Sequence, residues 1–68
     1  MSDLRLTRRE RQVMGMIGEG FGVREIAQRL AITPDTARKH RDNAVRKDGT
    51  GSQAAVVRKL AERHTASA

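Results

Sequence analysis

The chain has 68 residues and no cysteine, which allows one small domain without a disulfide, and its two histidines are too few for a structural zinc site. Its net charge of +6 favours an acidic partner such as nucleic acid, whereas a single aromatic residue, Phe21, argues against binding single strands by base stacking. No apolar run is long enough to span a membrane and no signal peptide is recognisable, so we expect a soluble cytoplasmic protein.

The first predicted helix covers residues 8–19. Thr7 and Glu10 have the spacing of a capping box, in which each side chain accepts a hydrogen bond from the other's backbone N–H. One apolar stripe follows at helical spacing, formed by Val13, Met14 and Ile17. Gly20 is a natural stop for this helix.

The second predicted helix covers residues 23–30, after the tight connection at 20–22. Its apolar residues lie on one face, namely Ile26, Ala27 and Leu30. Only Ala31 and Ile32 then separate it from the next start signal. A link this short requires the second and third helices to cross at a steep angle.

The third predicted helix covers residues 34–48. Thr33 is suited to capping its first turn, Pro34 follows where a missing N–H costs nothing, and Gly49 is suited to ending it. The segment is rich in cations, namely Arg38, Lys39, Arg41, Arg46 and Lys47. Two short helices around a tight link, the second one basic, are the pattern of a helix-turn-helix, whose second helix enters the DNA major groove.

The fourth predicted helix covers residues 53–63, with Ser52 as its cap after a glycine-rich break. Its apolar stripe, Val56, Val57 and Leu60, is suited either to covering the core or to forming a dimer interface. We expect a single domain over residues 1–68, with an ordered core at 6–63 and tails at 1–5 and 64–68. The fold class is therefore all-α, with four helices.

The string LTRRERQVMGMIGEGFGVREIAQRLAITPDTARKH resembles the LuxR/GerE-type (NarL/FixJ-like) helix-turn-helix, whose pattern is LTxRExxVLxLxxxGxxxxEIAxxLxxSxxTVxxH. The resemblance extends over about residues 6–60 and rests on many positions that agree in order without gaps. It implies a four-helix domain whose third helix reads the major groove and whose fourth helix often forms a homodimer. It also implies a transcriptional regulator that binds double-stranded DNA sequence-specifically.

The resemblance carries three base-reading positions to this chain, and they share one strip of the third helix: Arg38, Lys39 and Asp42. Phosphate contacts are expected from Thr33, Thr36, Arg41, Arg46 and Lys47. Two of these assignments have alternatives in the sequence. Asp42 is suited to an ion pair with Arg38 or Arg46 four residues away, and Lys47 to a salt bridge with Glu10.

Three residues of the third helix depart from the family pattern. Ala37 stands where the family usually has Val, Ala44 where it has Ile, and Asp48 where it has Leu. The smaller side chains predict a third helix held less firmly, unless residues such as Met14 repack against it. Asp48 is expected to be exposed at the helix end, or paired with Arg46 or Lys59.

No grouping of nucleophile and base is present, so we expect no enzyme, and no cofactor, metal or small-molecule ligand. Two alternatives to a LuxR-type regulator stay open. One is a promoter-binding module like region 4 of a sigma factor, and the other is a protein-interaction module that binds RNA polymerase or another regulator. In each case the expected location is the nucleoid of a bacterial or phage-infected cell, either as a stand-alone protein or as part of a longer one.

Overall fold

The computed structural model describes the backbone of residues 5–66 and the side chains of residues 5–62, and it contains four helices in that range. They are α1 (Arg8–Gly18), α2 (Val23–Leu30), α3 (Pro34–Asp48) and α4 (Gln53–Ala66). The described residues form no strand, which confirms the all-α prediction. No helix among them is both long and apolar enough to cross a membrane.

All four helices begin at the residues that the sequence predicted, and three of them have the expected side-chain cap. In α1 the backbone N of Glu10 donates to Thr7 Oγ1 at 3.1 Å, and the backbone N of Thr7 donates to Glu10 Oε1 at 3.0 Å. In α3 the N–H of Thr36 donates to Thr33 Oγ1 at 3.2 Å. In α4 the N–H of Ala55 donates to Ser52 Oγ at 3.2 Å. Each cap satisfies a backbone group that would otherwise lack a partner.

Two predicted helix ends differ slightly from the structure. α1 ends at Gly18, one residue early, and Gly20 follows in the left-handed conformation with φ of 101°. α4 continues to Ala66, three residues past its predicted end. Residues 64–66 contain no glycine or proline, so nothing in their chemistry stops the helix.

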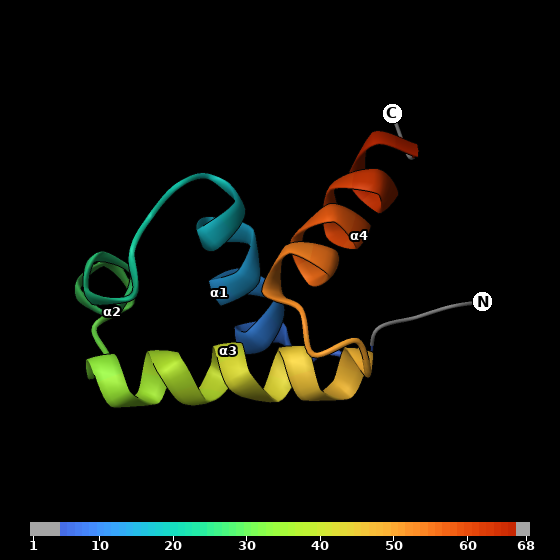
Figure 1. Cartoon of the computed structure of the whole chain (residues 1–68). Coiled ribbons are helices and arrows are strands. Elements are labelled where there is room, and N and C mark those ends of the chain that lie inside the picture. The colour runs from blue at the N-terminus through green and yellow to red at the C-terminus, as the bar shows by residue number, and fades with distance from the viewer. Residues whose placement is uncertain (1–4, 67–68) are drawn as a thin grey trace.

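The link between α2 and α3 is a helix-ending turn built on Ala31. Ala31 adopts the left-handed conformation with φ of 58°, and the N–H of Ile32 donates to the carbonyl of Ala27 at 2.9 Å. This arrangement ends α2 and turns the chain sharply within two residues, so that α3 starts in a different direction. As a result α3 begins immediately beside α2 and runs beneath the other helices (Figure 1).

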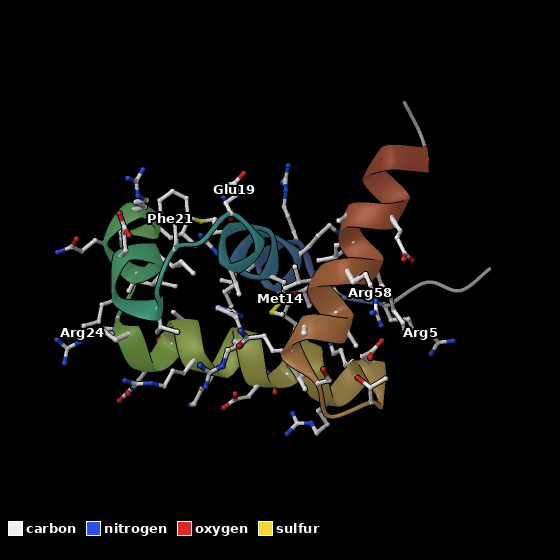
Figure 2. The ribbon with its side chains drawn as sticks, turned by 45° about the horizontal axis from the view of Figure 1, so that its top comes forward. Arg5, Met14, Glu19, Phe21, Arg24 and Arg58 are labelled. Atoms are coloured by element: carbon white, nitrogen blue, oxygen red, sulfur yellow. The ribbon has the colours of Figure 1, made fainter. Side chains whose placement is uncertain are left out.

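The core consists of two clusters that meet along α3. One joins α1, α3 and α4 through Met14, Ala44 and Val56, together with Leu6. The other joins α1, α2 and α3 and contains Val13, Ile26, Ala27 and Ala37. Met14 lies between α1 and its neighbours α3 and α4 (Figure 2).

Both alanines that depart from the family pattern are completely buried. Ala37 and Ala44 have no solvent exposure, and Met14 packs against Ala44 as the sequence suggested. Phe21 is half-buried, and the Arg29 guanidinium lies 4.5 Å from the centre of its ring. The small side chains therefore lie within packed clusters rather than at the surface.

Candidate nucleic-acid interface

The exposed strip of α3 contains the three predicted base-reading residues. Arg38, Lys39 and Asp42 are all exposed, and their spacing along the helix places them on one side. The opposite side of α3 carries Ala37 and Ala44, which face the core. The geometry therefore leaves this strip free to meet a partner.

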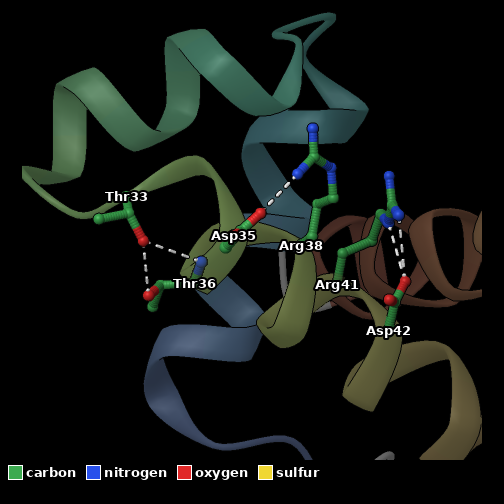
Figure 3. A network of polar contacts seen from close by, with 6 residues as sticks. All are labelled: Thr33, Asp35, Thr36, Arg38, Arg41 and Asp42. Carbon is green, nitrogen blue, oxygen red and sulfur yellow. Dashed lines mark hydrogen bonds and ion pairs between the residues drawn. The ribbon is translucent and has the colours of Figure 1, made fainter.

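Two ion pairs lie along the strip (Figure 3). Arg38 Nη1 donates to Asp35 Oδ1 at 2.8 Å. Arg41 Nε and Nη2 both lie 3.1 Å from Asp42 Oδ1. The predicted alternative, that Asp42 pairs with Arg38 or Arg46, is wrong in its partner, because Asp42 pairs with the adjacent Arg41 instead.

The first turn of α3 offers a hydroxyl donor at its surface. Thr33 accepts from the N–H of Thr36, and its own hydroxyl donates to Thr36 Oγ1 at 2.9 Å (Figure 3). Thr33 thus uses both its proton and its oxygen within the cap. The hydroxyl proton of Thr36 stays available, so Thr36 is the better of the two predicted phosphate contacts.

Arg46 and Arg41, two of the other predicted phosphate contacts, differ in their exposure and in their side-chain partners. Arg46 is exposed and donates to the side-chain oxygen of Asn43, one turn earlier. Arg41 is 29% exposed at its side chain and is shared with Asp42. Both keep N–H groups that can turn toward a phosphate, because a guanidinium carries five donors.

Lys47 forms an ion pair with a buried carboxylate of α1, although its own side chain is 37% exposed. Its Nζ lies 2.8 Å from Oε1 of Glu10, whose side chain is only 5% exposed. Burial alone would raise the pKa of Glu10, but hydrogen bonds from Lys47 and Thr7 and the charge of Lys47 outweigh it and lower that pKa. Of the two roles that the sequence allowed for Lys47, the structure contains the salt bridge.

Asp48 is paired and covered rather than exposed at the helix end. Its Oδ1 accepts from Lys59 Nζ at 2.7 Å, its Oδ2 accepts from the Thr50 hydroxyl, and its side chain is 1% exposed. The hydrogen bond from Lys59, followed by that from Thr50, lowers the pKa of Asp48. This pair joins the end of α3 to α4, at the position where the family resemblance implies a leucine.

The predicted dimer residues of α4 do not form one exposed stripe. Val56 is completely buried within the chain, so it belongs to the core and is removed from the predicted interface. Val57 and Leu60 are half-buried against the same cluster. A methyl group added at Gly18 would lie 3.0 Å from Val57 Cγ1, so α1 and α4 are in close contact there.

The residue that sequence reasoning underestimated is Asp35. We assigned it no role at the strip, yet its carboxylate binds the guanidinium of Arg38. The spacing of three residues on a helix was the signal available. Among the described residues, no group of three or more histidine, aspartate or glutamate side chains is placed to hold a metal ion.

Comparison with known proteins identifies the family of the chain. A family model described as "Bacterial regulatory proteins, luxR family" matches residues 4–60. The chain is 38% identical over 55 residues to the transcriptional regulatory protein UhpA of Escherichia coli (strain K12), and 43% identical over 53 residues to the transcriptional regulatory protein MctR of Rhizobium johnstonii. The chain belongs to the luxR family of bacterial regulatory proteins.

The similarity to these relatives covers only part of them. The match with UhpA spans 81% of this chain and 28% of the relative, and the match with MctR spans 78% and 25%. The chain therefore corresponds to about a quarter of the length of these regulators. No solved structure matches the chain.

Replacing Lys47 by Met tests whether its salt bridge holds α3 to α1. The substitution keeps an apolar stem but leaves the buried Glu10 carboxylate without its cation, so we expect a loss of about 1–3 kcal/mol in the free energy of unfolding. Urea denaturation at pH 7, followed by circular dichroism, measures it. Lys39→Met is the matched control, since Lys39 is exposed without a side-chain partner among the described residues, and it should change stability by less than about 0.5 kcal/mol. Equal effects of the two variants would contradict the structural role of Lys47.

Acid should destabilise the domain through Glu10 and Asp48. Both have a lower pKa in the folded protein, so the unfolded chain binds protons more readily and low pH favours unfolding. The stability should be complete above the ordinary pKa values of 4.5 and 3.8, and should fall as the pH drops through these and then through the lower folded values. Urea midpoints between pH 7 and pH 3 measure the loss, and Glu10→Gln should flatten the profile. A midpoint that does not move with pH would exclude this linkage.

Proposed function

We propose that the domain binds double-stranded DNA sequence-specifically through α3 and serves as the DNA-binding part of a transcriptional regulator. The observation that carries the proposal is a capped helix whose strip of charged side chains is exposed while its opposite side is buried against α1, α2 and α4. Membership of the luxR family and the similarity to transcriptional regulatory proteins support it.

In this proposal the first turns of α3 enter the major groove. Arg38 donates two hydrogen bonds to O6 and N7 of a guanine, and Lys39 reaches a neighbouring acceptor. Asp42 accepts from a cytosine amino group, using Oδ2, since Oδ1 is bound by Arg41. The strip therefore offers both donors and acceptors to base edges.

Phosphate contacts in this proposal come from residues on the flanks of the strip. Thr36 donates its free hydroxyl proton, and Arg41 and Arg46 place guanidinium groups beside the backbone. Lys47 is not included, because its ammonium group is bound to Glu10. We place this activity at the bacterial nucleoid, in the cytoplasm.

Alanine substitutions in α3 test the proposal by separating base contacts from phosphate contacts. Arg38→Ala should cost about 1–3 kcal/mol at the preferred site and relax the preference at one base pair. Arg46→Ala should weaken all duplexes alike and reduce the slope of log K against log salt concentration by about 1. Fluorescence polarisation with a duplex selected from a random pool, measured against competitor DNA, gives both quantities.

Arg29→Ala is the control for loss of one positive charge, because Arg29 stacks on Phe21 and pairs with Glu25 on α2. It should leave the base preference unchanged. Weak, sequence-indifferent and strongly salt-sensitive binding by the unmodified domain would overturn the proposal and favour a protein-interaction module that binds RNA polymerase or another regulator.

We also propose that two copies associate through α4 when bound to DNA, with the partly exposed Val57 and Leu60 at the contact. A dimer would read two half-sites about one helical turn apart. Ala54→Glu tests this, because Ala54 is exposed one turn before Val57 and the added charge leaves the core untouched. Sedimentation velocity with a two-site duplex should show a 2:1 complex for the unmodified domain and mainly 1:1 for the variant. A strict monomer with and without DNA would contradict the dimer.

A further inference from the structure

Arg38, which we propose reads a base, is bound by a carboxylate in the first turn of its own helix, where a negative charge is also modestly favourable to the helix dipole. Asp35 lies in the first turn of α3, its side chain is 88% exposed, and its Oδ1 accepts from Arg38 Nη1 at 2.8 Å (Figure 3). An ion pair this exposed contributes little to folding. It also lowers the positive charge of the surface that we propose meets DNA. The dipole interaction would be made equally well by an acid that does not bind Arg38, so the pairing itself points to a role in recognition.

We propose that Asp35 is a positioning and specificity-determining residue, which orients Arg38 and selects the base pair beside the one that Arg38 reads. This inference rests on the proposed function, since it assumes that α3 enters the major groove. The partner it selects is defined by chemistry: a base whose major-groove edge presents an amino group, which is cytosine through N4 or adenine through N6.

The positioning role follows from the geometry of the guanidinium group. Arg38 is 49% exposed at its side chain and would otherwise sample many rotamers, each of which must be lost on binding DNA. A hydrogen bond from Nη1 to Asp35 fixes the plane of the group before binding. The donors on Nε and Nη2 are left for the acceptors of a guanine.

The selective role follows from the oxygen that Arg38 does not use. Oδ2 of Asp35 has no hydrogen bond among the described residues, and the side chain is open to solvent. A carboxylate in the groove is repelled by the phosphates unless a base donates to it. Asp35 therefore weakens binding to every duplex that lacks an amino group at this point, and sites that have one are favoured by comparison.

The decisive comparison is between Asp35→Asn and Glu25→Gln. Glu25 is the corresponding acid in the first turn of α2, and it pairs with Arg29 at 3.4 Å on a side of α2 where Arg29 stacks on Phe21. Each variant removes one negative charge from an exposed carboxylate–arginine pair. Only Asp35 lies on the strip of α3, so only its variant should alter base preference.

The measurement is fluorescence polarisation at one fixed salt concentration. The duplexes are the site selected by the unmodified domain from a random pool, the same site with each base pair changed in turn, and an unrelated duplex of equal length. Circular dichroism establishes that each variant is folded. Asp35→Glu is included because it restores the charge and, with one more methylene, the ability to accept from an amino group.

Asp35→Asn should bind the unrelated duplex about threefold to tenfold more tightly, because a repulsive charge is removed. Its discrimination at one base pair, next to the guanine read by Arg38, should fall by about tenfold. Asp35→Glu should recover most of that discrimination, and Glu25→Gln should leave it unchanged. In the background of Arg38→Ala, Asp35→Asn should no longer affect the preference at the guanine itself, because the residue it positions is gone.

Identical affinities and base preferences in Asp35→Asn and Glu25→Gln would overturn this inference while leaving the proposed function intact. Loss of discrimination in Asp35→Glu equal to that in Asp35→Asn would also overturn it, since the carboxylate would then not be the selecting group. If the unmodified domain selects no site from the random pool, the proposed function fails together with the inference. The outcomes are therefore distinguishable in one set of titrations.

Discussion

The position of α3 depends on the ion pair between the buried carboxylate of Glu10 and the partly exposed ammonium group of Lys47. Glu10 belongs to the first turn of α1, where its carboxylate also accepts from the N–H of Thr7, and Lys47 belongs to the last turn of α3. One side chain thus closes the start of one helix and fixes the end of another. Because the carboxylate is nearly inaccessible to solvent, loss of its partner would leave a charge unpaired, which binds the two helices into one unit.

The three residues of α3 that depart from the family pattern change the contacts that fix this helix to the rest of the domain, but the helix is still packed against it. Ala37 and Ala44 bury little area, so each contributes less hydrophobic stabilisation than a valine or an isoleucine. Small side chains also let helices approach closely, and Met14 packs against Ala44. At the far end of the helix, the Asp48–Lys59 pair takes the place of a buried leucine. Polar contacts at the end of α3 thus supplement the small apolar contacts along its length.

Local chemistry explains which features could be predicted from the sequence. The starts of α1, α3 and α4 depend on Thr7, Thr33 and Ser52, whose hydrogen bonds reach only three residues along the chain. The partner of a charged side chain is harder to predict, because several oppositely charged residues lie within reach and sequence spacing does not determine which of them it binds. Asp42 illustrates this, because it binds Arg41. The burial of Val56 likewise followed from how α4 packs on the domain, since its stripe was equally compatible with core and interface.

In the proposed complex, different residues attract the DNA and recognise its bases. The net charge is +6, yet Arg38 in the strip and Arg41 beside it each share their charge with an aspartate. In this proposal, long-range attraction to DNA must then come largely from exposed cations away from the strip, such as Arg58 and Arg24. Arg24 extends outward from α2 (Figure 2). Those contacts are non-specific and screened by salt. A strip of mixed sign adds little to this attraction, so its donors and acceptors act mainly at contact, where base edges differ.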